Sequence, residues 1–169
     1  RSQGAIRAVG VGINQWQMLR DFVAAGDFDY FLLAGRYTLL EQEPLDSLLV
    51  ECQKRNTKIV IGGPYNSGIL ATGPVKGAMF NTRPAPQRIL NQVAKIQAVC
   101  QRHNVPMAAA ALQCPLAHPV VASTIPGAQS IAEFQQNLDF MQSRIPAALW
   151  ADLKSEGLMA ANAPVPEGR

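Results

Sequence analysis

Four short apolar runs along the chain have the pattern of buried parallel strands. They occupy residues 6–12, 29–33, 58–61 and 120–124. None of them alternates strictly between apolar and polar residues, which is typical of strands that are covered on both faces. The pattern therefore predicts a parallel sheet with helices packed around it.

Helical periodicity follows each predicted strand. The predicted helices span residues 15–25, 44–55, 86–103, 106–116, 130–141 and 146–158. Pro44 suits the first position of its helix, and Ser130 is predicted to cap the helix that follows the last strand. The alternation of strands and helices predicts an α/β fold with right-handed crossovers. Residues 62–85 are rich in Gly, Pro, Asn and Thr and are predicted to be a long loop without secondary structure.

Composition narrows the class of protein. The chain has 169 residues, of which 48% are hydrophobic and 16% are charged, so it can form the core of one domain. A net charge of +3 argues against a dedicated nucleic-acid-binding protein. No apolar run approaches the ~18–20 residues of a membrane helix, and the first residues lack a signal-peptide pattern, so we expect a cytoplasmic protein without a membrane partner. Cys52, Cys100 and Cys114 form no metal-ligand pattern, so we expect reduced thiols and no metal.

Candidate ligand contacts are expected where the predicted strands end. Ligands of parallel α/β folds bind beyond the carboxyl ends of the strands. This rule selects residues 13–15, 34–43, 62–85 and 125–129. It places His118 on the opposite side of the sheet and His103 at the end of a helix, so neither is expected to be catalytic. The selected loops contain no nucleophile motif and no acid–base pair, and we assign no catalytic residue.

Two features of the loops bear on phosphate binding. The first strand has two glycines, Gly10 and Gly12, but Gln15 stands where G-x-G-x-x-G needs its third glycine, which disfavours a Rossmann site. The glycine-rich turns at residues 62–68 and 126–128 could approach a phosphate closely. The second turn leads into the helix that Ser130 opens, whose N-terminal N–H groups favour an anion. An ordinary strand-to-helix turn remains the alternative.

Four stretches together resemble the carboxyl-terminal half of the aldo-keto reductases, a family of (β/α)8 barrels. They are residues 6–14, residues 36–40 (RYTLL), residues 62–70 (GGPYNSGIL), and residues 125–130 together with Asn137-Leu138. The runs LLAGRYTLL, NSGILATG and AAALQCPLAHP resemble the aldose (L-fucose, D-threo-aldose) and pyridoxal dehydrogenases of that family. The resemblance implies four βα units that form the second half of a TIM barrel. Residues 1–169 would then be one half-barrel domain whose N-terminal half is absent, and the start at Arg1 is interpreted as a truncation.

The resemblance also implies a site for a nicotinamide cofactor. Asn14 matches the asparagine that holds the carboxamide, and Tyr65 would cover the nicotinamide ring, since Gly62 replaces the family's tyrosine. Residues 64–70 match the segment around the pyrophosphate, and Asn137 matches the asparagine that contacts the adenine. The residues assigned to cofactor binding are Asn14, Gly62, Pro64, Tyr65, Asn66, Ser67, Gly68, Leu70, Pro126, Gly127, Ala128, Gln129, Glu133, Gln136 and Asn137.

Cofactor preference and activity follow from the same resemblance. Glu133 stands where NADP-preferring members carry an arginine, which favours NAD, with NADP as the weaker alternative. The family's catalytic tyrosine, lysine, aspartate and histidine come from the first four strands and have no counterpart in this chain. We therefore expect the cofactor-binding half of an oxidoreductase that acts on a sugar or related alcohol or carbonyl compound, inactive by itself.

The partner of such a half-barrel would be the missing N-terminal half or a second copy of the chain. Four parallel strands cannot close a barrel, and the first and last strands would each keep an unpaired edge. A non-enzymatic, open-sheet binding module of flavodoxin-like topology is the alternative from another class, because it explains the same order of strands and helices without a missing half.

Overall fold

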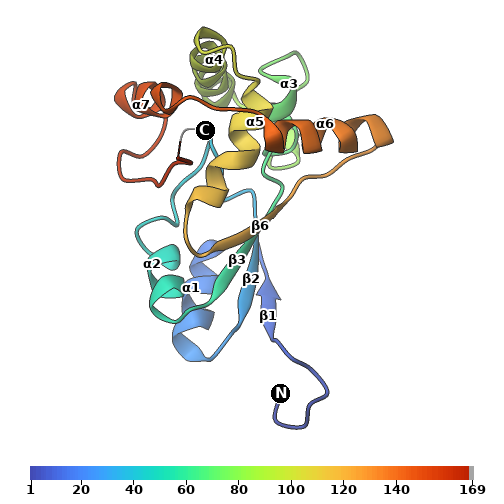
Figure 1. Ribbon diagram of the computed structural model, residues 1–169, viewed down its shortest axis with the longest axis vertical. Coiled ribbons are helices and arrows are strands. Elements are labelled where there is room, and N and C mark those ends of the chain that lie inside the picture. Colours follow the sequence, from blue (N-terminus) through green and yellow to red (C-terminus); the bar gives the residue numbers. More distant parts are fainter. Residues whose placement is uncertain (168–169) are drawn as a thin grey trace.

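The predicted strands pair into one parallel sheet in a computed structural model that describes residues 1–167 (Figure 1). The strands are β1 (Gly10–Gly12), β2 (Tyr30–Ala34), β3 (Lys58–Gly62) and β6 (Val121–Ile125), in the order β1-β2-β3-β6. Every neighbouring pair is parallel. The predicted parallel sheet is therefore confirmed. Among the described residues, no helix is both long and apolar enough to cross a membrane.

The first strand is shorter than predicted, because its pairing begins only at Gly10, opposite Tyr30. Before Gly10, the Asp29 N–H donates to the Val9 carbonyl at 2.9 Å, while the Val9 N–H donates to the Asp29 carboxylate at 2.7 Å. Gly10 is required by close packing, since a Cβ atom there would lie 2.5 Å from the carbonyl oxygen of Tyr30. Gly10 thus lets β1 approach β2, whereas a Cβ atom at Gly12 would make only ordinary contacts with Leu32.

Helices follow the strands in the predicted order. They are α1 (Trp16–Ala25), α2 (Leu48–Lys54), α4 (Gln87–Arg102), α5 (Met107–Gln113), α6 (Ile131–Gln142) and α7 (Ala147–Ser155), with a 3₁₀ turn, η1 (Cys114–Ala117), after α5. Helix α2 begins four residues after Pro44, because the residues between form turns. The backbone N–H groups of Ser47 and of Leu49, in the first turn of α2, donate to the Pro44 carbonyl. Ser130 caps α6 as predicted, since its hydroxyl accepts from the Glu133 N–H at 3.1 Å.

The prediction that residues 62–85 lack secondary structure is wrong. This segment contains the short helix α3 (Ile69–Thr72) and a hairpin of β4 (Met79–Phe80) and β5 (Arg83–Pro84). Ile69 and Leu70 are buried, which anchors α3 in the core. These elements are two to four residues long, so they are too short for apolar periodicity to reveal them in the sequence.

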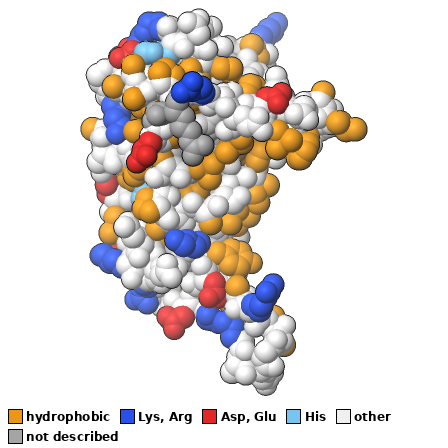
Figure 2. Space-filling view, viewed as in Figure 1, with side chains coloured by type: hydrophobic (Ala, Val, Ile, Leu, Met, Phe, Trp, Pro, Cys, Tyr) orange, Lys and Arg blue, Asp and Glu red, His pale blue; other side chains and the backbone are white. Residues whose placement is uncertain are grey.

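The two faces of the sheet differ in their cover. Phe31, Leu33, Ile59 and Ile61 occupy paired, alternate positions of β2 and β3, so they share one face of the sheet, and all four are fully buried. Helices α1 and α2 lie along one side of the sheet (Figure 1). On the other face no helix covers the sheet in Figure 1, and Tyr30 is 43% exposed. Figure 2 shows hydrophobic side chains gathered along this open side and beneath α6. The sheet is thus covered on one face only, which positions the carboxyl ends of its strands beside an open surface.

Candidate functional site

A buried hydrogen-bond network joins the carboxyl ends of β2 and β3. Asn66, which follows β3, is 3% exposed. Its amide nitrogen donates to the Glu41 carboxylate at 2.8 Å and to the Gly35 carbonyl at 3.1 Å. Its amide oxygen accepts from the Thr38 hydroxyl at 2.7 Å. Asn66 was predicted to bind the cofactor pyrophosphate, yet in this structure its side chain fastens the loop after β2 to the loop after β3.

Glu41 and Arg36 form the charged part of this network. The guanidinium of Arg36 lies 3.4 Å from the Glu41 carboxylate, and both side chains are largely shielded from solvent. Burial raises the pKa of the Glu41 carboxyl, while Arg36 and the amide of Asn66 act in the opposite direction. The sequence interpretation missed Glu41, because a single acid after the apolar run TLL carries no motif. The only available signal was its place in a loop at the carboxyl end of a strand.

A polar pocket of about 230 Å³ opens beside this network. Its lining includes Asn14 after β1, Arg36 and Glu41 after β2, and Asn81 in the β4–β5 hairpin. Loops that follow three neighbouring strands therefore meet here, as the carboxyl-end rule predicts. Asn14 is exposed at this pocket, where its amide can both donate and accept hydrogen bonds.

Tyr65 and Asn137 contact each other across the fold. The Tyr65 hydroxyl donates to the amide oxygen of Asn137 at 2.6 Å, and each residue is 9% exposed. Burial raises the pKa of Tyr65 to about 12. Tyr65 therefore joins the loop after β3, to which it belongs, to α6. This place does not support the expectation that its ring covers a nicotinamide ring.

The N-terminal end of α6 carries a second polar cluster. The Glu133 carboxylate accepts from the Gln129 N–H at 2.6 Å, while Ser130 accepts from the Glu133 N–H. Gly127 lies in open space, since a Cβ atom there would have no heavy atom within 4 Å. The turn before α6 thus presents backbone to solvent, with a fixed carboxylate one turn along the helix.

The remaining predicted cofactor residues divide into buried and exposed groups. Gly62, Pro64 and Leu70 are buried, whereas Gly68, with a φ of 93°, begins α3 beneath open space. Ser67 is exposed and accepts from the Thr82 N–H of the hairpin at 3.1 Å. Pro126, Ala128 and Gln129 precede α6, and Gln136 lies on it. Pro126 is half-buried, and the other three residues are exposed.

The residues that we did not assign to the site lie elsewhere. His118 is buried with its ring against Tyr37, and His103 contacts Asp152 at 2.8 Å between α4 and α7. Burial raises the pKa of the Cys100 thiol to about 11, which makes a reactive thiolate unfavourable. Each histidine thus contacts another side chain of the fold and lies outside the polar pocket.

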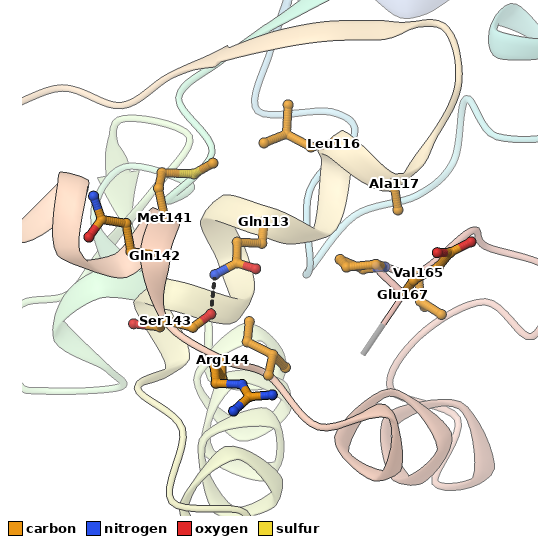
Figure 3. Close-up of a pocket in the computed structure, with 11 residues that line it drawn as sticks. Gln113, Leu116, Ala117, Met141, Gln142, Ser143, Arg144, Val165 and Glu167 are labelled. Atoms are coloured by element: carbon orange, nitrogen blue, oxygen red, sulfur yellow. Dashed lines mark hydrogen bonds between the residues drawn. The ribbon is translucent and has the colours of Figure 1, made fainter. Parts of the chain in front are cut away.

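A larger cavity, of about 810 Å³, lies apart from the carboxyl ends of the strands. It is formed by η1, the end of α6 and the last described residues (Figure 3). Gln113 donates to the carbonyl oxygens of Ser143 and Phe140 at its wall. None of the residues assigned to cofactor binding lines it. Its size alone does not make it the functional site.

The fold and the site define a half-barrel of the α/β class with polar loops at the carboxyl ends of its strands. The sequence profile of the Aldo/keto reductase family matches residues 1–156. The chain therefore belongs to the aldo/keto reductase family, whose members are oxidoreductases that use nicotinamide cofactors.

The chain is similar to two dehydrogenases over nearly its whole length. It is 39% identical over 160 residues to pyridoxal 4-dehydrogenase from Microbacterium luteolum, which covers 95% of this chain and 47% of that protein. It is 35% identical over 160 residues to D-threo-aldose 1-dehydrogenase from Pseudomonas sp, covering 94% and 49%. These relatives confirm the resemblance to the aldose and pyridoxal dehydrogenases. The chain spans about half the length of the curated relatives that it matches.

Solved structures of aldo-keto reductases match the fold of this chain. Aldo-keto reductase AKR11C1 from Bacillus halodurans, in its holo form, matches with a TM-score of 0.72 at 21% identity. The match covers 98% of this chain and 54% of that chain. A thermostable aldo-keto reductase, Tm1743, matches with a TM-score of 0.61 at 18% identity, covering 91% of this chain and 50% of that one. The four βα units are therefore half of a TIM barrel.

Proposed function

We propose that this chain is the cofactor-binding half of an NAD-dependent oxidoreductase that interconverts a sugar or related alcohol and its carbonyl compound. The observation that carries the proposal is the similarity to two dehydrogenases, of pyridoxal and of an aldose, at 39% and 35% identity. Pyridoxal and aldoses are both small polar molecules that carry hydroxyl groups, which suits a polar pocket. When bound, the nicotinamide supplies hydride chemistry.

The residues present fit a dinucleotide. Asn14 lines the polar pocket and offers an amide to the carboxamide of the nicotinamide. The turns at Gly68 and Gly127 leave open space above the backbone, which a pyrophosphate needs for close approach. Asn66 supports these loops from inside rather than by contact with the cofactor. We keep Tyr65 and Asn137 as a supporting pair beneath the adenine end.

Glu133 supports NAD as the preferred cofactor over NADP. Its carboxylate is held by the Gln129 N–H and lies at the N-terminal end of α6. A 2′-phosphate close to it would meet a like charge, whereas a ribose hydroxyl could donate to the carboxylate. One relative at 22% identity is described as an NADH-specific methylglyoxal reductase from Escherichia coli, which agrees with this preference.

The catalytic groups would come from a complementing N-terminal half. Three observations support this partner: the chain spans about half the length of its relatives, the outer edges of β1 and β6 have no strand beside them in the described residues, and one face of the sheet is open. A second copy of the chain would bring no catalytic residues, so the N-terminal half is the favoured partner.

Complementation tests the proposal. We expect the purified chain alone to produce no NADH from L-fucose or pyridoxal, and turnover to appear when the N-terminal half of a related dehydrogenase is added. The same N-terminal half without this chain is the control. Turnover by the pure chain would contradict the proposal that the catalytic groups come from the N-terminal half. A stable monomer that neither binds NAD nor responds to the added half would contradict the proposed cofactor-binding role.

Cofactor preference is tested by titration of the complemented enzyme with NAD and NADP. We expect tighter binding of NAD, and we expect Glu133→Arg to shift the preference toward NADP by roughly tenfold, because a repulsive charge becomes an attractive one. Glu133→Gln is the matched control, since it removes the charge without reversing it. Tighter binding of NADP by the unmodified protein would refute the role proposed for Glu133.

A further inference from the structure

The parallel sheet has two outer edges, at β1 and at β6, and within the described part of the chain neither edge has a strand beside it. Val9 and Ile13 form backbone hydrogen bonds toward the β2 side of the sheet. The alternate residues Gly10 and Gly12 therefore present their N–H and C=O groups at the outer edge of β1. Such an edge is a template for pairing with another strand. Because all four strands are parallel, a strand that runs in the same direction would extend the sheet at either edge.

Exposed apolar side chains lie at both edges of the sheet. Beside β1 they are Ile6, in the segment that leads to this strand, and Met18 on α1, which are 51% and 48% exposed. Beside β6, the exposed side chains of Phe134, Leu138 and Met141 on α6 line an apolar pocket of about 530 Å³ together with residues of the strand. Each outer helix packs chiefly against one neighbour, α1 against α2 and α6 against α5. Each edge of the sheet thus has an apolar surface of its own.

The apolar surfaces of the two edges lie at matching heights along the strands. Helices α1 and α6 each follow a strand of the sheet, so both begin at the carboxyl ends of the strands. Met18 and Phe134 lie near the starts of these helices, and therefore at the same end of the sheet. Ile6 and Met141 lie toward the other end, because Ile6 precedes β1 and Met141 is near the end of α6. The apolar side chains of one edge thus have counterparts at the same heights on the other edge.

The two edges are also complementary in charge. The segment before β1 contains Arg1 and Arg7 and no acidic residue. Helix α6 contains Glu133 and Asp139 and no lysine or arginine. Opposite charges favour association of the two edges. One chain cannot join its own edges, because four strands are too few to close a barrel.

We propose that two copies of this chain pair around a two-fold axis parallel to the strands, so that β1 of each copy lies beside β6 of the other. This axis joins both pairs of edges with all strands parallel, and the two four-stranded sheets together close into a barrel without a free edge. The open faces of the two sheets become its interior. The pairing needs no cofactor, so it does not rest on the proposed function. It competes with a complementing N-terminal half, which needs the same edges.

One charged side chain of the open face limits the affinity of the pair. Lys58 on β3 stands opposite Tyr30 on β2, so both side chains belong to the open face, and both are exposed. In the pair, the lysines of the two copies point toward the two-fold axis, and like charges across an interface oppose association. We therefore expect a dissociation constant of roughly 50 µM, so that the dilute chain is a monomer. Lys58→Met should tighten the pair about fivefold, with a larger effect at low salt than at high salt.

Sedimentation equilibrium of the unmodified chain, between about 5 and about 500 µM, tests the pairing. We expect the mass to rise from 18.2 kDa toward twice that value and to stop there, because a two-fold pair is closed. A chain that stays monomeric over the whole range overturns the proposal. A mass that continues to rise beyond the pair also overturns it, since it shows open-ended association.

Variants of the two edges test the arrangement of the pair. Met18→Lys and Phe134→Glu should each weaken self-association roughly hundredfold, because the two-fold pair contains each change twice, at about tenfold per contact. An equimolar mixture of the two variants should associate again, since one pair of edges is then unmodified and the other joins a lysine to a glutamate. Val50→Lys, at an exposed position of α2, is the control and should leave the affinity unchanged. Far-UV circular dichroism checks that each variant is folded. A mixture that stays monomeric, or an equal loss of affinity in Val50→Lys, overturns the proposal.

Discussion

The two faces of the sheet have opposite surroundings although the same strands form both. Leu33 on β2 is fully buried against the helices, whereas its neighbour Leu32 points to the other face and stays partly exposed. Ile61 on β3 is fully buried, while Ile125 on β6 is 51% exposed. One face therefore finds its cover within the chain and the other does not. An apolar surface without cover is typical of an interface.

The largest expected effect contrasts the two neighbouring leucines of β2. Leu33→Ala should lower the free energy of unfolding of the chain by about 3 kcal/mol, because it leaves a cavity in a packed core. Leu32→Ala should cost less than about 1 kcal/mol in the chain alone, since its side chain already meets solvent. Urea unfolding followed by circular dichroism measures both.

Adding the complementing N-terminal half sharpens this contrast. If that half covers the open face, the cost of Leu32→Ala should rise toward that of Leu33→Ala in the complex. Equal and large costs in the isolated chain would show that the second face is already covered there, which contradicts the difference between the faces.

A second, smaller effect concerns the apolar surface of α6 beside the open face. Phe134 is 59% exposed, and Leu138 on the same helix is 42% exposed. Phe134→Ser should weaken binding of the complementing half about tenfold, because part of its apolar area would be buried in the complex. Calorimetric titration measures the affinity. Gln135→Ala, at the next position on the helix, is the control, and equal affinities of the two variants would exclude α6 from the interface.

The smallest effect concerns Glu41, which lies at the carboxyl edge of the sheet. Burial raises the pKa of this carboxyl in the folded state above its ordinary value of 4.5. The folded state therefore holds the proton more tightly than the unfolded state, and this group lowers the stability as the pH rises from about 4.5 through the raised pKa. Glu41→Gln should remove that fall.

The measurement is urea unfolding of the chain and of Glu41→Gln at several pH values across this range. Asp21→Asn, which removes a carboxylate that is 73% exposed, serves as the control. If the stability of the unmodified chain instead rises relative to Glu41→Gln through the same range, then the attraction of Arg36 outweighs burial, and the pKa of Glu41 is lowered by folding rather than raised.

Some of the site could be predicted from the sequence, and some could not. The carboxyl-end rule brought Asn14 and Arg36 to one edge of the sheet, and the structure confirms that they line one pocket. The same rule did not identify the role of Asn66, because its three hydrogen bonds join residues that are up to 31 positions apart. The hairpin was missed because its strands are too short to produce a pattern.

The sequence by itself determined the order of the four sheet strands and the longer helices, the parallel sheet and the family, because these depend on local apolar periodicity and on contiguous motifs. Only the tertiary structure decided which side chains meet, such as Tyr65 with Asn137 and Arg36 with Asn81. It also decided that one face of the sheet is left uncovered. Those properties arise from contacts between distant segments, and the free energy of such contacts depends on geometry that no local pattern records.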